Sequence, residues 1–230
     1  MQDWTLRWQP TIEAWVTAQM SAADAGHGID HVRRVVENAK KIGGFEGANP
    51  NIYLPAAWLH DCVFVPKNSE HRSKASTLAA ESAKAYLQSI RYPEQHVNRI
   101  CHCIQAHSFS ANIECESIEA RVVQDSDRLE ALGAIGLARC LMTGGAMGQR
   151  LYHPEQPFPV DRQPKDNEQS VDHFFSKLLG LHRTMQTQAG RDEAKRRTVF
   201  LIDFLRQLAT EIHGSCDELE RSFQRWGQPI

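Results

Sequence analysis

The sequence predicts an all-α protein. Apolar residues recur at helical spacing along most segments that lie between turn signals. No stretch shows the strict alternation of apolar and polar residues that a half-exposed strand requires. The chain has 230 residues, of which 41% are apolar and 23% are charged, so its composition is that of an ordinary globular protein with a sizeable core. We therefore expect a single-domain helical bundle over residues 1–230.

The first predicted helix covers residues 3–20, where Pro10 should break or kink the early part because proline lacks an amide hydrogen. Three tryptophans of this segment are expected in the core, namely Trp4, Trp8 and Trp15. A turn rich in alanine, glycine and aspartate follows at residues 21–28. The next helix begins near His31, buries a stripe of valines and stops at Gly43-Gly44, which places His31 at the edge of the core.

The most informative stretch is a short apolar helix predicted for residues 52–62, which ends in the pair His60 and Asp61. These two side-chain types bind divalent cations through nitrogen and oxygen. Neighbouring side chains on a helix diverge by about 100°, yet both project from the same turn and can reach one cation between them. Because one pair cannot hold a metal alone, further ligands must come from elsewhere in the chain.

The rest of the chain continues the helical pattern, with loops that proline, glycine and polar residues mark. Helices are expected at residues 71–90, 93–107, 116–141, 171–188, 191–213 and 217–226, and loops at residues 63–70 and 144–169. The loop at residues 144–169 holds four prolines and few apolar residues. It is too long for an ordinary connection, so we interpret it as either a functional loop or a mobile flap.

Composition argues against several classes of function. The formal net charge of −2 provides no basic surface for nucleic acid or for an anionic membrane. No window approaches the roughly 18 consecutive apolar residues of a membrane-spanning helix, and the N-terminus lacks the basic and apolar regions of a signal peptide. The six cysteines form no CxxC pair and are expected to remain thiols. We therefore expect a cytoplasmic protein without nucleic-acid or membrane partners.

Other candidate ligands are histidines and carboxylates that lie beside apolar stripes. His31 opens a helix whose next turns are apolar, and Asp125 and Asp127 lie within an apolar segment. A buried carboxylate must be paired or bound to a metal, because burying a bare charge costs several kcal/mol. Each residue also has an ordinary interpretation, either a histidine that is merely hydrogen-bonded or carboxylates paired with Arg121 and Arg128. The succession of His, His-Asp and Asp on three separate helices favours a metal site.

This succession resembles the four-ligand signature of the HD-domain superfamily of metal-dependent phosphohydrolases. Four segments are similar, in order, to motifs of one group of small stand-alone bacterial members: residues 28–35, 56–61, 125–136 and 172–179. The resemblance extends over roughly residues 20–210. It implies a helical bundle of the HD type, with a metal-binding core at residues 20–140 and C-terminal helices at residues 170–226 packed on that core.

Carried over by position, the family pattern assigns the metal ligands to His31, His60, Asp61 and Asp127. Asp127 is chosen over Asp125 because the family places this ligand just before a basic residue. Asp125 would then orient a ligand or a water, and it is also the alternative ligand. Two imidazoles and two carboxylates suit Mn²⁺, Fe²⁺, Co²⁺, Ni²⁺ or Mg²⁺ in six-coordination better than they suit a closed structural zinc site.

Four further residues are candidates for the reaction itself. His71 and His107 resemble positions that the family keeps polar near its metal, where a histidine can orient water or protonate a leaving oxygen. Lys74, one turn from His71, and Arg128 can hold the charge of a phosphate group. For each of the four, a solvated or structurally paired side chain is the alternative interpretation.

The resemblance implies a metal-dependent phosphohydrolase that acts on a small phosphorylated substrate, such as a nucleotide or a nucleoside di- or triphosphate. Two alternatives stay open: a di-iron HD-domain oxygenase, and a module that binds a nucleotide without turnover. The oxygenase would need further histidines such as His71 and His107 for a second metal, and His71 follows Asp61 more closely than two-metal members lead us to expect. The oligomeric state is also open, a homodimer included.

The loop at residues 144–169 has a place in this hypothesis. It is expected to close over the substrate, with contacts from four of its polar residues: Tyr152, His153, Arg162 and Lys165. Shortening it should then impair turnover and leave the metal content unchanged.

Overall fold

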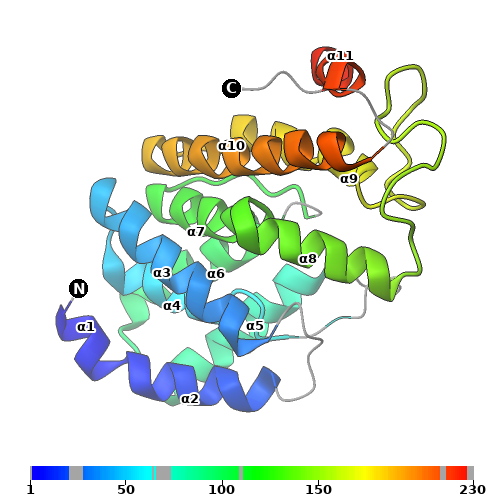
Figure 1. The fold of residues 1–230 in the computed structure, drawn as a ribbon. Helices are drawn as coiled ribbons and strands as arrows, with labels where there is room; N and C mark the ends of the chain where they lie inside the picture. Colours follow the sequence, from blue (N-terminus) through cyan, green and yellow to red (C-terminus); the bar gives the residue numbers. More distant parts are fainter. Residues whose placement is uncertain are drawn as a thin grey trace. The chain divides into compact units, whose positions relative to one another are not determined.

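The computed structural model of the chain describes residues 2–20, 28–63, 65, 74–108, 111–212 and 216–226. Within these ranges the regular structure is helical (Figure 1), and the one β-type feature is an isolated bridge between Arg150 and Gln169. The all-α prediction is therefore confirmed. None of the described helices is both long and apolar enough to cross a lipid bilayer.

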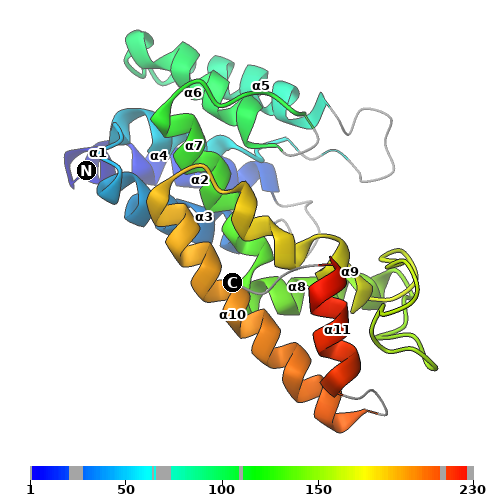
Figure 2. The same cartoon turned by 90° about the horizontal axis from the view of Figure 1, so that it is seen from above.

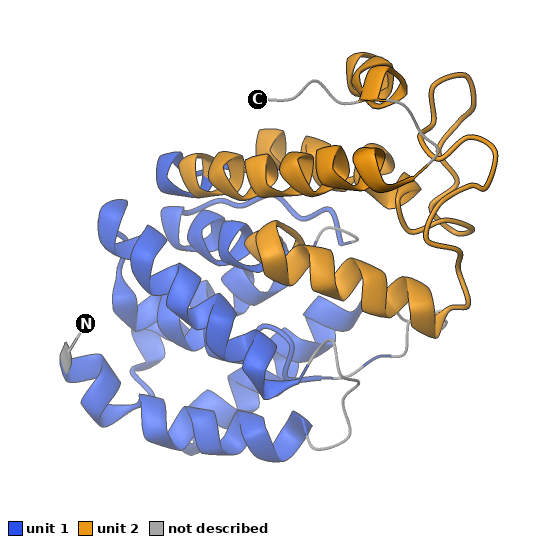
Figure 3. Ribbon diagram, in the orientation of Figure 1, with its two compact units in different colours: residues 1–127, 186–190 blue, residues 128–185, 191–230 orange. Residues whose placement is uncertain are grey.

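The chain divides into two compact units (Figure 3). Unit 1 contains Met1–Asp127 and Gln186–Gly190, and unit 2 contains Arg128–Met185 and Arg191–Ile230. The chain thus leaves unit 1 after Asp127, returns to it for the five residues Gln186–Gly190, and then passes back into unit 2. These five residues lie just before and at the start of a helix. The single-domain organisation inferred from the sequence stays a prediction.

Unit 1 is built around a central helix, α4. The described residues of its first segment form α1 (Gln2–Arg7), α2 (Gln9–Gln19), α3 (Ile29–Phe45), α4 (Pro50–Leu59), α5 (Ala75–Ser89), α6 (Glu94–His107) and α7 (Ile118–Arg128). Helix α4 packs against α2, α3, α5 and α6, and α5 and α6 lie side by side (Figure 2). Every residue of α4 from Ile52 onward is buried. A helix that is apolar on all sides must be enclosed by others, which explains its central position.

The ends of α3 and α4 follow from local chemistry. Gly47 has a φ of +66°, and the next amide, that of Ala48, donates to the carbonyl of Gly43 at 3.0 Å. This is the glycine-terminated helix end that satisfies late carbonyl groups. The side chain of Asn49 accepts a hydrogen bond from the Asn51 amide at 3.0 Å and so caps α4. The prediction that this helix stops at Gly43-Gly44 was wrong, because the left-handed residue that ends it is Gly47.

Gly43 instead permits a close approach between α3 and α4. A Cβ atom at Gly43 would lie 2.6 Å from Cζ and 2.7 Å from Cε1 of Tyr53. Tyr53 is fully buried, so its ring has little room to move away. The absence of a side chain at Gly43 therefore sets how closely the two helices pack.

Two predicted helices are interrupted in the structure. The segment predicted as one helix over 116–141 forms α7, a 3₁₀ turn at Leu129–Ala131 and α8 (Gly133–Ala146), with Leu132 extended at φ −122° and ψ 161°. The segment predicted over 171–188 forms the short α9 (Asp172–Ser176) and a 3₁₀ stretch at Leu178–Thr184. Both predictions were wrong in the same way, since helical spacing of apolar residues continues across a break in the backbone.

The remaining elements agree with the predictions. The first segment is indeed two helices that meet at Trp8, and α6 ends at His107 as expected. Helix α10 (Gln188–Glu211) and helix α11 (Cys216–Trp226) lie within a few residues of their predicted limits. Helix α4 ends at Leu59 rather than residue 62, so His60 and Asp61 lie in the turn that follows it.

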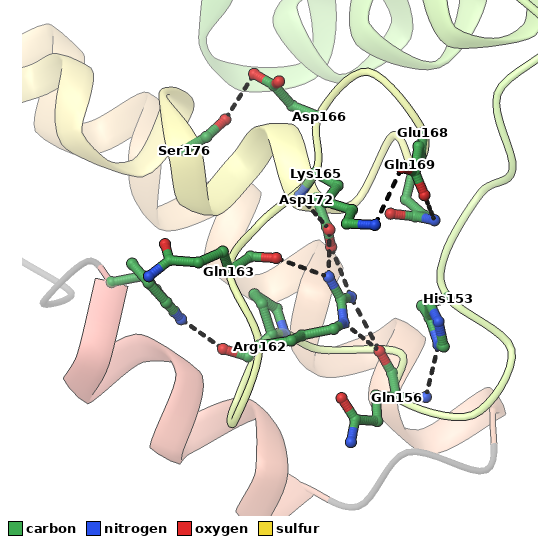
Figure 4. A network of polar contacts seen from close by, with 12 residues as sticks. His153, Gln156, Arg162, Gln163, Lys165, Asp166, Glu168, Gln169, Asp172 and Ser176 are labelled. Atoms are coloured by element: carbon green, nitrogen blue, oxygen red, sulfur yellow. Dashed lines mark hydrogen bonds and ion pairs between the residues drawn. The ribbon is translucent and has the colours of Figure 1, made fainter.

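The long connection between α8 and α9 is held by a buried ion pair (Figure 4). Both guanidinium nitrogens Nη1 and Nη2 of Arg162 donate to the carboxylate of Asp172, the second at 2.8 Å, and Asp172 is fully buried. The Lys165 amide donates to the same carboxylate at 2.7 Å, and Arg162 also donates to the carbonyl of Gln156 at 3.0 Å. Arg162 therefore has a structural task within the loop, which distinguishes it from the substrate contact hypothesised above.

Replacement of Gly43 by alanine should destabilise the protein. In an ordinary helix interior this change is stabilising by about 0.5–1 kcal/mol, but here the new methyl group would overlap the Tyr53 ring. We expect a loss of roughly 1–3 kcal/mol in the free energy of unfolding, measured by urea denaturation. Gly44→Ala, on the exposed side of the same helix, is the matched control and should be neutral or stabilising. Equal behaviour of the two variants would contradict the packing argument.

Replacement of Arg162 by alanine should loosen the loop between α8 and α9. Removing one partner of a buried ion pair leaves an uncompensated charge and costs roughly 3–5 kcal/mol. Urea denaturation should report that loss, and limited proteolysis should cut within residues 147–171 sooner than in the wild type. Lys165→Ala removes only an exposed pair with Glu168 and should cost less than about 1 kcal/mol. Unchanged protease resistance in Arg162→Ala would refute this role.

Candidate metal centre

The turn after α4 directs the imidazole of His60 inward. His60 is fully buried, and its Nδ1 lies 2.8 Å from the carbonyl oxygen of Ala57. A carbonyl oxygen only accepts hydrogen bonds, so Nδ1 carries the proton and donates. In the neutral ring the lone pair is then on Nε2, the atom that points to the centre. This tautomer is the one that binds a metal through Nε2.

His31, in the first turn of α3, meets His60 at this point. Its side chain is 2% exposed, and the two Nε2 atoms are 3.3 Å apart. The rings are arranged edge to face, with centroids 5.3 Å apart. Two buried imidazole nitrogens aimed at one another require a proton or a cation between them, since two lone pairs at that distance repel.

The two predicted carboxylate ligands complete the group. Oδ1 of Asp127, from α7, lies 3.4 Å from Nε2 of His31 and 3.8 Å from Nε2 of His60. Oδ2 of Asp61 lies 3.8 Å and 3.6 Å from the same two nitrogens. Neighbouring ligand atoms of a six-coordinate cation with bonds of about 2.1 Å are about 3 Å apart. The four side chains thus fit one divalent cation with a small inward movement.

Exposure is divided unevenly within this group. His31 and His60 are buried, whereas the side chains of Asp61 and Asp127 are 33% and 29% exposed. The histidines therefore form the closed side of the centre and the carboxylates border its open side. An open side leaves coordination positions for water and for a ligand, as catalytic rather than structural metal sites require.

His107, the last residue of α6, joins the group as a fifth side chain. Its Nε2 lies 3.6 Å from Oδ1 of Asp61, its ring centroid is 4.9 Å from that of His60, and its Nδ1 is bound to the carbonyl of Ile104. Among the described residues, two sets of ligand atoms are close enough to share an ion, one formed by His31, His60 and Asp127 and the other by His60, Asp61 and His107. Because His60 has one free lone pair, the two sets cannot each use it for a separate ion.

Burial and charge together set the protonation of these side chains. Burial lowers the pKa of His60, and the nearby carboxylate of Asp61 only partly opposes it. Burial opposes ionisation of Asp61 and Asp127, but the surrounding histidines outweigh it and hold both carboxyl pKa values below their usual range. The pKa of His107 is raised, because Asp61 outweighs burial. Ionised carboxylates beside a neutral His60 are the state that metal binding needs.

The two ligand sets contain none of the other candidate residues that the structure describes. Asp125 is fully buried, but its carboxylate is bound to the backbone of Gln186 and Thr187, and the structure does not bring it into the ligand set. Arg128 belongs to unit 2, where its Nη1 donates to the carbonyl of Thr184. Lys74 is exposed and directly precedes α5. His71 lies outside the described residues.

Sequence reasoning missed two features of this centre. It gave His107 a role in proton transfer and did not foresee contact with Asp61, although apolar Ile104 on the same helix face indicated burial. It also gave no role to Gln124, whose amide Nε2 donates to the carbonyl of Ala106 at 2.7 Å. That bond joins α7 to α6 beside His107, and no sequence pattern in either helix predicts it.

The fold and the four candidate ligands are typical of one class of protein. A model of the HD domain matches residues 28–132, a range that contains all four candidate ligands. The Bacillus subtilis protein YpgQ is 34% identical over 209 residues, which cover 88% of this chain and 93% of that protein. The chain therefore belongs to the HD-domain superfamily, as the resemblance predicted.

Two solved structures place the chain among particular relatives. The crystal structure of B. subtilis YpgQ in complex with ADP has a TM-score of 0.71 at 32% identity and covers 91% of this chain and 97% of YpgQ. An HD-superfamily hydrolase from Bacillus thuringiensis has a TM-score of 0.67 at 35% identity, covering 88% of this chain and 97% of that one. The chain is thus similar to small bacterial HD proteins over nearly their whole length.

Removal of one ligand should abolish tight metal binding. We expect the wild type, supplied with Mn²⁺ and dialysed, to retain one ion per chain by elemental analysis. Asp61→Ala should bind Mn²⁺ at least roughly 100-fold more weakly, since loss of a direct ligand exceeds the 10–100-fold effect of supporting residues. The control is His102→Ala on α6, because His102 Nε2 only accepts the Glu116 amide at 3.2 Å. Equal Mn²⁺ content in the two variants would contradict the assignment.

Proposed function

We propose that this protein is a metal-dependent phosphohydrolase that acts on a small phosphorylated substrate, a nucleotide or a nucleoside di- or triphosphate. The observation that carries the proposal is the convergence of two buried imidazoles and two half-exposed carboxylates on one point of unit 1. Membership of a superfamily with named hydrolases supports the reaction class. The ADP bound by YpgQ, a relative at 32% identity, supports a nucleotide as the substrate.

The residues present fit a divalent cation held by His31, His60, Asp61 and Asp127. Such an ion, Mn²⁺, Fe²⁺, Co²⁺, Ni²⁺ or Mg²⁺, supplies a bound water of lowered pKa and a positive charge beside a phosphoryl oxygen. The mixed nitrogen and oxygen donor set favours six-coordination over a closed tetrahedral zinc site. Among these ions we favour manganese as the first to test, because it accepts both donor types.

Two side chains of the centre, Asp61 and His107, connect metal binding to proton transfer. Asp61 uses Oδ2 toward the two histidine ligands and Oδ1 toward Nε2 of His107. The Ile104 carbonyl occupies Nδ1 of His107, so Nε2 is the atom that exchanges a proton. The raised pKa of His107 favours its protonated form. As the oxygen of water bonds to phosphorus, the water loses a proton to solvent, the bond between phosphorus and the leaving oxygen breaks, and Nε2–H of His107 donates its proton to that oxygen.

The proposal extends to the setting of the protein. All cysteines among the described residues are free thiols, which is consistent with a reducing cytoplasm. The net charge of −2 supports a small-molecule substrate rather than nucleic acid. We therefore place the protein in the cytoplasm with a soluble phosphorylated substrate.

A second candidate function rests on His107. Asp61 and His107 lie beside the set formed by His31, His60 and Asp127, and the two oxygens of Asp61 face different histidines. These two side chains would hold the second iron of a di-iron oxygenase. Aerobic and anaerobic metal analysis separates the candidates, since the oxygenase requires two irons per chain.

The role of His107 can be tested with phosphate release from a panel of nucleotides in the presence of Mn²⁺. We expect His107→Gln to lower kcat by roughly 10²–10⁴ and to keep its metal content, because loss of a general acid leaves the four ligands in place. His102→Gln should behave as the wild type. Absence of phosphate release from any nucleotide by the metal-loaded wild type would refute the proposed function. Loss of metal from His107→Gln would instead make His107 a ligand.

A further inference from the structure

The carboxylate of Asp125 binds a segment that follows it by some sixty residues. Asp125 is fully buried in α7, two residues before Asp127. Its Oδ1 accepts the Gln186 amide at 3.0 Å, and its Oδ2 accepts the Thr187 amide at 2.8 Å and the Thr187 hydroxyl at 2.6 Å. These donors satisfy a buried charge that would otherwise be costly.

The same contacts fix the start of α10. Thr187 Oγ1 accepts the Gly190 amide at 3.0 Å and so caps the helix. A Cβ atom at Gly190 would lie 2.4 Å from Oδ2 of Asp125 and 2.6 Å from Thr187 Oγ1. Only glycine leaves room for the carboxylate at this position. Asp125, Thr187 and Gly190 form one interlocked group, which we term the α7–α10 clamp.

Further hydrogen bonds connect the same segment to other helices of unit 1. The side-chain amide of Gln186 donates to that of Gln124, which in turn donates to the carbonyl of Ala106, the residue before His107. The Ala189 amide donates to Glu46, directly after α3, at 2.9 Å. The five residues Gln186–Gly190 are therefore tied directly to α7 and to the end of α3, and through Gln124 of α7 to α6.

We infer that Asp125 is a positioning residue of the metal centre, which acts through α7 on Asp127. Side chains two positions apart on a helix diverge by about 200°, so Asp125 and Asp127 project to nearly opposite sides. Holding Asp125 in the clamp fixes the rotation of α7 about its axis and thereby aims the Asp127 carboxylate at His31. This inference rests on the metal site of the proposed function and is independent of the reaction catalysed there.

The position of the clamp in the chain gives it a second consequence. The chain passes between the units at 127/128, 185/186 and 190/191, and each of these points lies within three residues of a clamp residue or of Asp127. Two clamp residues, Thr187 and Gly190, thus lie beside the points at which the chain enters and leaves unit 1. The segment Gln186–Gly190 thus helps to position the metal ligand Asp127, although it follows Asp127 by about sixty residues.

The experiment compares Mn²⁺ affinity with stability in four variants of the full chain. We expect Asp125→Asn and Thr187→Val to bind Mn²⁺ roughly 10–100-fold more weakly than the wild type, the range found when supporting residues of metal ligands are lost. Thr187→Ser retains the hydroxyl and should restore the affinity. The matched control is Glu119→Gln, also a buried carboxylate on α7, which binds the Asn49 amide and Arg99 more than two turns from Asp127. It should lower the Tm and leave the Mn²⁺ affinity unchanged.

Each outcome decides the inference. An unchanged Mn²⁺ affinity in Asp125→Asn, or an equal loss in Glu119→Gln, would overturn it, because the effect would then be absent or merely one of stability. If Asp125→Asn does not fold, the difference between Thr187→Val and Thr187→Ser decides, and equal affinities there would overturn the inference. A wild type that binds Mn²⁺ but releases no phosphate refutes the phosphohydrolase and leaves the positioning role supported by the affinities. A wild type without Mn²⁺ affinity overturns both.

Discussion

One hydrogen bond governs the geometry of the centre, the bond from Nδ1 of His60 to the carbonyl of Ala57. The last turn of α4 leaves that carbonyl without a helical partner, and the imidazole that follows satisfies it. The bond selects the tautomer of His60 and turns Nε2 toward His31 and the two carboxylates. Because α4 is enclosed by four helices of unit 1, the ring cannot rotate away. The packing of the apolar helix α4 therefore fixes the orientation of the His60 imidazole.

The polar side chains gathered at the end of α4 stabilise one another's ionisation. Carboxylates in a protein interior normally become harder to ionise, yet here the adjacent imidazoles reverse the effect for Asp61 and Asp127. The imidazole of His60 responds differently, since burial outweighs the attraction of Asp61. A site with ionised oxygens and a neutral nitrogen attracts a cation and repels an anion. A phosphate group would therefore approach such a centre only after a cation is bound.

Sequence patterns predicted the parts of this protein that depend on local chemistry. Helix α4 was predicted from its apolar run. Polar residues beside apolar stripes indicated candidate ligands, and the resemblance to the HD-domain superfamily selected the four among them. The structure brings all four ligands together. Helix boundaries depend on single residues, so the end at Gly47 and the break at Leu132 were missed.

Contacts between distant segments were beyond the reach of such patterns. The partners of Asp125 lie 61 and 62 positions further on. Nothing in residues 186–190 indicates that their amide groups donate hydrogen bonds to a carboxylate on a distant helix. The substrate contact expected of Arg162 follows from its place in the long loop, and no local pattern there predicts an ion pair. Its partner Asp172 follows ten positions later, at the start of the next helix. Local sequence specifies which groups need a partner, and only the folded chain specifies which partner they receive.

The return of the chain to unit 1 at Gln186–Gly190 bears on what counts as an independent part of the molecule. The range matched by the HD model ends at residue 132, and every metal ligand lies inside it. A fragment cut at that boundary would keep the ligands but lose the three donors that hold the buried carboxylate of Asp125. A buried charge that loses hydrogen bonds either draws in water or loosens the helix that bears it. The compact unit that holds the candidate ligands is therefore discontinuous, and its boundaries cannot be drawn as a single interval of sequence.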